Sequence, residues 1–404
     1  MLQFFSASTS IVNSKRAITE CLENALKGEP DLNCSLIILF TAMGHNFQEL
    51  LTEAHLLSPD ARIIGCTGAG IIGVNGPDES KKALAIMAVK GPKNEFAVSG
   101  TDSTENSDPF DVGTSLAQDL KKQNPEVSII LFYPSTRGMY FGWERAITGI
   151  ETVFGPNIPI IGGIASDGGR FVSDFQLFDD KVLEQGAVIA GFADPTLELL
   201  SLSNHGVDGI GTPFKVTRSV ENHVYELDGK PAWISLTDKL GLPDATSPLE
   251  IFPFASIVKE IPEKFQEEYD NKYIVAAAPI PDSDGSIYTT IPSPVGTRLW
   301  LTKRKEQKIF DGVDQMIKRV VKRIGDRKPV AIFHSDCTTR GKLSFDRIVK
   351  DKIIGKLQTP LCKGEKIPWA GIYVSGQIAP LRGCNMVHFY TSSLYVLVRR
   401  KEFL

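Results

Sequence analysis

The chain has 404 residues, of which 42% are hydrophobic and 23% charged, and its net charge is -4. This composition is typical of a globular protein and gives no electrostatic reason to expect nucleic acid or an acidic membrane surface as a partner. The length exceeds one ordinary core, because domains commonly hold roughly 100 to 200 residues.

The first residues of the chain and its cysteines indicate the cellular compartment of the protein. The first ten residues, MLQFFSASTS, lack the basic segment and apolar core of a secretory signal, and no run of about 18 apolar residues is present. The six cysteines are scattered, with no Cys-x-x-Cys pair. We therefore expect a cytoplasmic protein with reduced thiols and without a bound cofactor.

In chain order, the first organised segment is a strand-helix-strand unit. An amphipathic helix is predicted over 14–28, with Ser14 as its N-cap. An apolar strand follows at 36–40, then a helix at 47–57 and a strand at 62–65. This order predicts a parallel strand pair joined by a crossover helix.

The same order returns later in the first half, with a strand at 129–132, a helix at 143–154 and a strand at 159–162. The repetition indicates either a weak internal duplication or convergence on a common α/β pattern. Further strands are predicted between and after the two units, at 83–89, 171–178, 187–192 and 197–202.

Residues 204–213, NHGVDGIGTP, are rich in glycine and polar residues, and we place a domain boundary there. The following half contains the turn signal Asp228-Gly229. It also contains a third strand-helix-strand pattern, at 330–333, 345–357 and 370–374. Its other predicted elements are extended chain over 214–227, a helix at 233–240, strands at 273–278 and 286–291, a helix at 313–324 and a closing strand at 394–398.

Two Gly-rich turns follow the paired strands of the first half, in RIIGCTGAGIIG (62–73) and IPIIGGIASDGG (158–169). Such turns let the backbone approach a ligand closely, although the same residues also form ordinary turns. Neither turn matches a P-loop or the dinucleotide fingerprint. The candidate ligand contacts here are Cys66, Thr67, Gly68, Gly162, Gly163, Ser166 and Asp167.

The densest polar segments lie in the second half, in AIFHSDCTTRGKL (331–343) and GIYVSGQIAP (371–380). The carboxyl ends of strands in open α/β sheets are where ligands bind. Arg340 is predicted to hold a carboxylate or phosphate through its planar fork, with a solvated surface charge or a helix-capping residue as the alternatives. The candidate contacts of this half are Cys337, Thr338, Arg340, Tyr373, Gly376 and Gln377.

Cys337 is either a buried spacer or a nucleophile that His334 or His388 would orient. His334-x-x-Cys337 also has the spacing of half a zinc site, but no second pair at ligand spacing follows. We therefore expect no metal at this position.

Together, the two Gly-rich segments, YELDGKPA, AIFHSDCTTRG and PWAGIYVSGQIAP resemble the FIST family in their order and spacing. The resemblance implies a FIST N-like domain over 1–210 and a FIST C-like domain over 211–404. The fold class expected is mixed α/β, with two domains that each hold a mixed sheet and flanking helices.

The resemblance also implies a sensory module of signal transduction that binds a small ligand such as an amino acid. Gln377 stands where many members have Glu, so a ligand ammonium group would be held less well here. The expected function is a sensor of a small anionic or amino-acid-like metabolite that signals through a separate kinase, chemoreceptor or cyclase-type partner. The alternatives are an enzyme with Cys337 or Cys66 as nucleophile and a protein-interaction scaffold that binds no small ligand.

Overall fold

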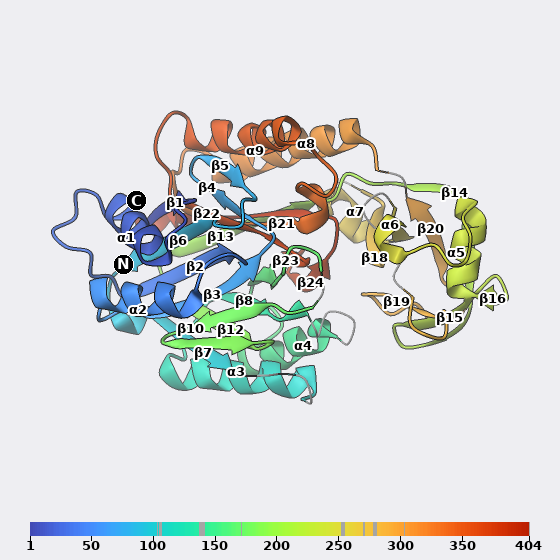
Figure 1. Ribbon diagram of the computed structural model, residues 1–404, viewed down its shortest axis with the longest axis horizontal. Helices are drawn as coiled ribbons and strands as arrows, with labels where there is room; N and C mark the ends of the chain where they lie inside the picture. The colour runs from blue at the N-terminus through green and yellow to red at the C-terminus, as the bar shows by residue number, and fades with distance from the viewer. Residues whose placement is uncertain are drawn as a thin grey trace.

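The computed structural model describes residues 1–102, 104, 107–136, 142–170, 172–251, 255–269, 271–277, 281–302 and 304–403. The fold is mixed α/β, as predicted (Figure 1). Phe171 and Ala278, at the ends of two predicted strands, lie outside the described residues.

Three strand-helix-strand units organise most of the chain, and the predicted third copy is among them. In each unit the two strands are parallel, which requires a crossover connection such as a helix. The units are β2 (Leu36–Ala42), α2 (Phe47–Leu57) and β3 (Arg62–Gly68); β8 (Ile129–Pro134), α4 (Trp143–Phe154) and β9 (Ile160–Ile164); and β21 (Pro329–Cys337), α9 (Arg347–Cys362) and β22 (Trp369–Val374).

Each unit is extended by two further strands, the nearer of them antiparallel to the first strand of the unit, and by a second helix. These elements are β1 (Gln3–Thr9), α1 (Ser14–Ala25) and β6 (Leu84–Lys90) for the first unit; β7 (Phe96–Thr101), α3 (Pro109–Gln123) and β12 (Ala187–Phe192) for the second; and β13 (Leu197–Asn204), α8 (Glu306–Ile324) and β25 (Ser392–Arg399) for the third.

A hairpin after each unit joins the sheet of another unit instead of its own. Among the described residues, three six-stranded sheets result with one common order, and they are connected in a cycle. The first strand of each hairpin pairs with the other unit, and the second strand pairs with the first. In the hairpin of β4 (Ile71–Gly73) and β5 (Gly76–Asp78), β4 pairs with β22. In the hairpin of β10 (Phe175–Phe178) and β11 (Lys181–Glu184), β10 pairs with β3, and in that of β23 (Gly376–Leu381) and β24 (Cys384–His388), β23 pairs with β9.

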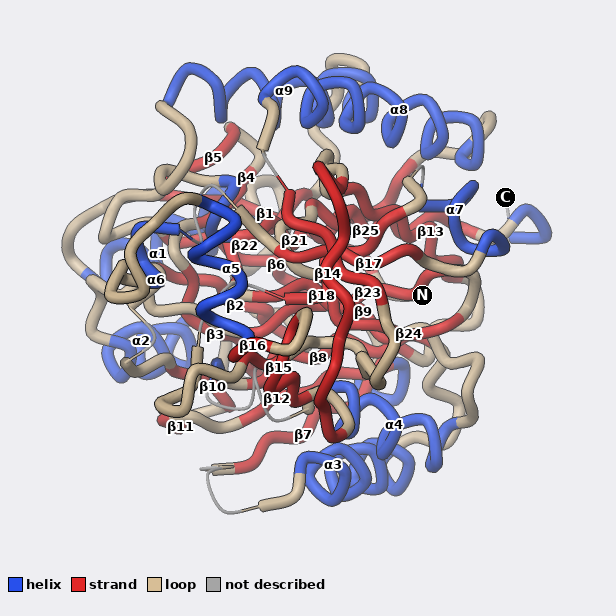
Figure 2. Tube along the Cα trace, turned by 90° about the vertical axis from the view of Figure 1, so that its right-hand side faces the viewer, coloured by secondary structure: helices blue, strands red, loops and turns tan. Residues whose placement is uncertain are grey.

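The three sheets lie inside and the helices cover them in pairs. In Figure 2 the pairs α1 with α2, α3 with α4 and α8 with α9 surround the strands on three sides. One apolar cluster at the centre takes residues from all three sheets, including Phe40, Tyr133 and Phe333. Separate clusters lie under each helix pair. The helical periodicity is explained by this arrangement, because each helix buries one face on its sheet.

Residues 209–302, which we call the inserted module, lie between β13 and α8 and project to the right in Figure 1. The module has its own sheet and its own apolar cluster, which includes Phe214, Trp233 and Leu236. Its elements are β14 (Gly209–Val220), β15 (His223–Leu227), β16 (Lys230–Pro231), α5 (Ala232–Leu240), α6 (Pro248–Ile251), β17 (Ile257–Glu260), α7 (Glu263–Tyr269), β18 (Tyr273–Ala277), β19 (Ile287–Tyr288) and β20 (Arg298–Thr302).

Some predicted boundaries were wrong. The N-cap of α1 is Asn13, whose side chain accepts a hydrogen bond from the Arg16 N–H, and Ser14 is the first helical residue. The strand predicted from residue 171 begins only at Phe175. The chain predicted as extended over 214–227 is a hairpin of β14 and β15, and Asp228-Gly229 turns the chain into β16 with positive φ at both residues.

The division into domains at residues 210 and 211 stays a prediction. That position lies inside β14. Strands from both sides of it share sheets, because β13 pairs with β25 and β9 pairs with β23.

Candidate functional site

The strands that end the three units, β3, β9 and β22, lead into turns that contact one another. Each turn donates one backbone N–H to a carbonyl oxygen of the next turn, so the bonds close a cycle. We call residues 66–70, 162–168 and 373–377 the turn ring. The three bonds, each 2.9 Å long, run from Ala69 to Tyr373, from Ser375 to Ile164 and from Ser166 to Thr67.

The glycines of the turn ring lie where neighbouring strands pack closely against one another. A Cβ atom added to Gly68 would lie 2.4 Å from Cγ1 of Ile372. Gly162 has a φ of +138°, and its added Cβ would lie 2.2 Å from the carbonyl oxygen of Phe132. These glycines therefore allow close packing, and their role as ligand contacts stays a prediction. Gly163 and Gly376 are crowded in the same way, by Val374 and Ile164.

The polar residues of the first two turns bond mainly to the chain around them. The Thr67 hydroxyl oxygen accepts a hydrogen bond from the Phe175 N–H at 3.0 Å. The Asp167 carboxylate accepts from the N–H groups of Arg170 and Val172, each at 2.8 Å, and so holds the turn that follows β9. Burial, with the Asp174 charge as a second cause, raises the pKa of the Cys66 thiol well above its ordinary value.

The structure brings the two halves of the predicted pocket into contact at Thr338. The Thr338 hydroxyl lies 3.3 Å from the Ser166 hydroxyl and donates to the Val374 carbonyl oxygen at 3.0 Å. Thr338 begins a short 3-10 helix, Thr338–Arg340, that follows directly after β21. The end of the third unit is therefore joined to the turn ring.

Arg340 is buried, with 2% of its surface exposed, so the surface-charge alternative is wrong. Its Nε donates to Oδ1 of Asp336 at 2.8 Å, and its Nη1 donates to the His205 carbonyl oxygen at 3.4 Å. Its Nη2 is buried and has no hydrogen-bond partner among the described residues. Because buried polar groups are nearly always hydrogen-bonded, this nitrogen marks a place for an acceptor.

A second guanidinium lies beside the first, and no motif in the sequence indicates it. Arg304 donates to the carbonyl oxygen of Thr339, and its Nη2 donates to the Thr339 hydroxyl at 3.2 Å. Burial and the neighbouring charge of Arg340 lower the pKa of Arg304 to about 10. We call Arg304, Asp336, Thr339 and Arg340 the arginine cluster; it holds two guanidinium groups and one carboxylate.

Histidines near the arginine cluster add no positive charge at neutral pH. Burial lowers the pKa of each of these imidazoles to about 4, because the interior penalises the charged ring. They are His205, His334 and His388. The arginine cluster therefore keeps an excess of one positive charge among these side chains.

The imidazoles predicted to orient Cys337 bond elsewhere. His334 Nε2 lies 2.8 Å from the Ser392 hydroxyl. The two ring nitrogens of His388 lie near the Tyr269 hydroxyl and the Ala379 carbonyl oxygen, at 3.2 and 3.1 Å. Cys337 itself is buried and accepts a hydrogen bond on sulfur from the Thr339 hydroxyl at 3.1 Å.

The last two predicted residues are Tyr373, on β22, and Gln377, on β23. Tyr373 is buried, and burial together with the Asp336 charge raises the pKa of its hydroxyl. Gln377 is buried on β23, and its Oε1 accepts from the Thr391 N–H at 3.3 Å. Its Nε2 has no hydrogen-bond partner in the described part of the chain.

Three surface hollows lie away from the arginine cluster in the described part of the chain. The largest, of about 1270 Å³, is lined by β1, the end of α1 and the segment that joins α9 to β22. The others, of about 810 and 190 Å³, lie beside His45 and beside Cys362. A group that could hold a metal ion, formed by His223, Asp282 and Asp284, lies in the inserted module.

Comparison with known families agrees with the resemblance. Residues 35–230 match the model of the FIST N domain, so the chain carries this domain, which is a small-ligand-binding sensory domain of signal transduction. The assignment of the rest of the chain to a C-terminal FIST domain stays a prediction. No described helix is long and apolar enough to cross a membrane.

Several proteins are similar to this chain over nearly its full length. Uncharacterized protein MT0656 of Mycobacterium tuberculosis (strain CDC 1551 / Oshkosh) is 25% identical over 396 residues, which cover 95% of this chain and 96% of that protein. Uncharacterized protein Mb0898c of Mycobacterium bovis is 25% identical over 381 residues, covering 91% and 92% of the two chains.

Two solved structures align along the chain with little sequence identity. A cyanuric acid hydrolase from A. caulinodans aligns with a TM-score of 0.36 and 9% identity, over 99% of this chain and 100% of that one. A chorismatase aligns with a TM-score of 0.34 and 10% identity, over 98% and 99% of the two chains. Nothing about the chemistry of this chain follows from either likeness.

Proposed function

We propose that this protein is a sensor that binds a small anionic or amino-acid-like metabolite at the arginine cluster and signals through a separate protein. The FIST N domain supports the sensory role. The observation that carries the proposed site is the buried Nη2 of Arg340, which has no acceptor among the described residues and lies beside a second guanidinium.

The proposed ligand carries a carboxylate or phosphate. A guanidinium forms its strongest bonds with such groups, because two parallel N–H donors match two oxygens. Arg340 uses Nε and Nη1 for Asp336 and His205, so Nη2 is the donor left for the ligand. The Thr338 hydroxyl, at the start of the same 3-10 helix, would provide a neutral polar contact.

Gln377 favours an anion over a zwitterion. Thr391 connects Gln377 to the end of β21, next to the cluster. The Thr391 N–H donates to Gln377, and the Thr391 carbonyl oxygen accepts from the Cys337 N–H at 3.0 Å. A neutral amide gives a ligand ammonium group no opposite charge. We therefore infer that simple carboxylates bind more tightly than amino acids.

The output is proposed to be a movement of the inserted module against the three units. Two side-chain hydrogen bonds cross this junction. The Tyr390 hydroxyl donates to the Ala255 carbonyl oxygen at 3.1 Å, and Tyr269 of α7 reaches His388. A ligand that enters here would change these contacts, and a hinge of this kind gives a two-state signal to a kinase, chemoreceptor or cyclase-type partner.

A thermal-shift screen against small carboxylates, amino acids and nucleotides tests the site. A ligand at about 100 times its dissociation constant adds about 2.7 kcal/mol, which raises the melting temperature by a few degrees. Arg340→Lys keeps the charge next to Asp336 but removes the planar fork, so the shift should shrink.

The matched control is Arg327→Lys, because Arg327 is nearly buried and pairs with Glu198 at 2.6 Å away from the cluster. Its ligand shift should equal that of the wild type. A hit that is equally strong in both lysine variants would place the ligand elsewhere. The absence of any hit among the anions would contradict the proposal and favour a scaffold.

The alternative of a cysteine-dependent enzyme has less support. Cys66 is fully buried with a raised thiol pKa, and the imidazoles near Cys337 bond to other groups. A nucleophilic thiol should react with iodoacetamide within minutes at neutral pH, whereas the sensor predicts slow labelling of Cys337. Retained ligand binding by Cys337→Ala would also separate the two functions.

A further inference from the structure

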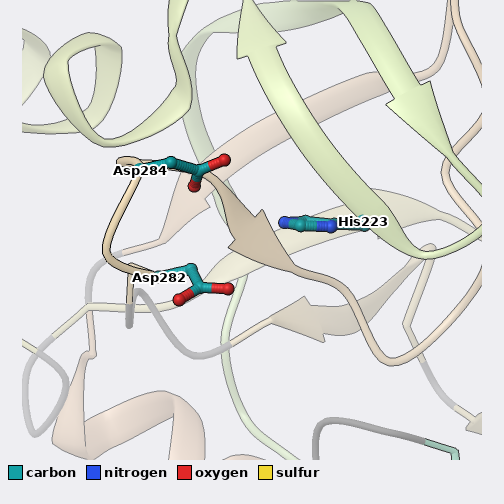
Figure 3. Close-up of side chains that lie close together, drawn as sticks. All are labelled: His223, Asp282 and Asp284. Atoms are coloured by element: carbon teal, nitrogen blue, oxygen red, sulfur yellow. The ribbon is translucent and has the colours of Figure 1, made fainter.

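The inserted module holds a second group of polar side chains that does not belong to the arginine cluster. His223 begins β15, and Asp282 and Asp284 lie on the turn that leads into β19. Figure 3 shows both carboxylates on one side of the imidazole ring and directed toward it. One oxygen of each carboxylate and one ring nitrogen all lie within 4.8 Å of one another.

The imidazole of His223 is held in place by two aromatic rings. Tyr288 stacks on it with ring centroids 4.1 Å apart and an interplanar angle of 15°. Tyr225 lies at 4.2 Å with an angle of 36°. The pairing of His223 with Tyr288 between β15 and β19 fixes the backbone as well. Because the ring is already ordered, little entropy is lost when its nitrogen binds a ligand.

The two carboxylates form a concentration of negative charge without a cationic partner. In the described part of the chain, neither Asp282 nor Asp284 forms an ion pair with Lys or Arg. Oδ1 of Asp284 accepts hydrogen bonds from the N–H and the hydroxyl of Ser286, the N–H at 2.9 Å.

We propose that His223, Asp282 and Asp284 form a binding site for a divalent transition-metal ion of the zinc type. Imidazole nitrogen favours zinc and its neighbours over calcium and magnesium, which prefer oxygen ligands alone. One nitrogen and two carboxylates are three ligands of the kind that zinc accepts. Both carboxylates are exposed, so the remaining coordination position is open to water or to a ligand.

Metal binding replaces one hydrogen bond of the protein. His223 Nε2 lies 2.5 Å from the Ser286 hydroxyl, and a bound ion takes the place of that contact. The bound ion ties the turn at 282–284 to the start of β15 and stabilises the inserted module in proportion to metal concentration.

Calorimetric titration of the chelator-treated full-length protein with Zn²⁺ tests the site. The wild type should bind one ion with an affinity that His223→Gln and Asp284→Asn each weaken at least tenfold. The controls are His55→Gln on α2 and Asp326→Asn after α8, which remove an imidazole and a carboxylate that do not belong to the proposed metal site. Both controls should bind as the wild type does.

A second readout separates loss of the site from loss of the fold. Co²⁺ bound through an imidazole gives visible absorption bands, which should appear with the wild type and be absent in His223→Gln. The melting temperatures of all variants in chelator should agree with the wild type. Equal Zn²⁺ affinity in His223→Gln and the wild type, or no saturable binding by the wild type, would overturn the proposal.

Discussion

The three interlocked units and the inserted module are built in different ways. In the units, strands distant in sequence share sheets, as β13 does with β25 and β4 does with β22. In the module, neighbouring strands pair within residues 209–302 around a separate cluster. Interlocked sheets cannot open one at a time, whereas a locally paired module can move or unfold alone. We therefore expect the module to unfold more easily than the units, although Val258 and Tyr273 of the module also pack in the apolar cluster under α3 and α4.

The largest expected effect on stability comes from adding a side chain at Gly65, where two strands of one unit lie in close contact. A Cβ at Gly65 would lie 2.0 Å from the Leu39 carbonyl oxygen, because β2 and β3 pair there. Gly65→Val should cost at least about 4 kcal/mol in the free energy of unfolding, since backbone must shift. Urea denaturation measures this cost.

The control is Gly355→Ala on α9, where an added Cβ meets no atom within 4 Å. This change should stabilise the protein by about 0.5 to 1 kcal/mol, because alanine favours helix and restricts the unfolded chain. Similar stability for Gly65→Val and the wild type would show that the units are not packed as described.

Removing the charge of Arg340 should also destabilise the units. Arg340→Ala leaves the Asp336 carboxylate buried without its partner, which costs roughly 3 to 5 kcal/mol. The double variant Asp336→Leu with Arg340→Met should recover part of the loss, because neither charge of this ion pair is left without its partner, while the Arg304 guanidinium keeps its bonds to Thr339. Chemical denaturation of the single and double variants checks this, and an equal loss in both would contradict the ion-pair explanation.

A core truncation in the module should have a local effect. Leu236→Ala removes a fully buried side chain and should cost roughly 2 to 5 kcal/mol. Hydrogen exchange should show lost protection in β14 to β20 and retained protection in β2, β8 and β21. Equal loss in both regions would show that the module and the units unfold together.

Acid should destabilise the units through their buried histidines. The pKa of His334 and His388 is about 4 in the folded protein, against 6.5 for an ordinary histidine. Below pH 6.5 the unfolded chain binds protons that the folded state excludes. Stability is therefore full above about pH 6.5 and is lost as the pH falls toward 4, by on the order of 3 kcal/mol for each histidine.

Denaturation midpoints measured between pH 4 and pH 7 check this dependence. His388→Gln should flatten the curve, and His55→Gln on the surface of α2 should leave it unchanged. The same slope in His388→Gln and the wild type would show that this imidazole is not buried in its neutral form.

The smallest effect is expected at an exposed ion pair. Arg145 and Asp108 are bonded at 2.6 Å, but their side chains are 56% and 43% exposed. Arg145→Ala should leave the free energy of unfolding nearly unchanged, because water already solvates both charges. A larger loss in urea denaturation would indicate that this contact between α3 and α4 is needed for the fold.

The repeating part of the fold was predictable from the sequence, because buried parallel strands are short apolar runs. Such runs predict β2, β8 and β21, and amphipathic patterns predict the helix after each of these strands. The exchange of hairpins could not be predicted: the pattern of Ile71 and Ile72 shows a strand but does not show that its partner is β22. The local signals for the helix α3 are Asp108 and Pro109, which act as its N-cap and first residue.

The candidate site was predictable only where one strand carries it. Thr338 and Arg340 follow β21 directly, so the rule for strand ends selected them. Arg304 follows β20 inside a basic run that has the appearance of solvated surface, and only the three-dimensional fold brings it to Thr339. The residues of the proposed metal site are likewise brought together only by the fold, because the pairing of β15 with β19 brings His223 to Asp282.

Calorimetric titration with the strongest carboxylate from the thermal-shift screen tests the central claim most directly. Anion binding at Arg340 predicts one site in the wild type, an affinity at least tenfold weaker in Arg340→Lys, and wild-type affinity in Arg327→Lys. The same affinity in all three proteins would contradict a ligand site at the arginine cluster.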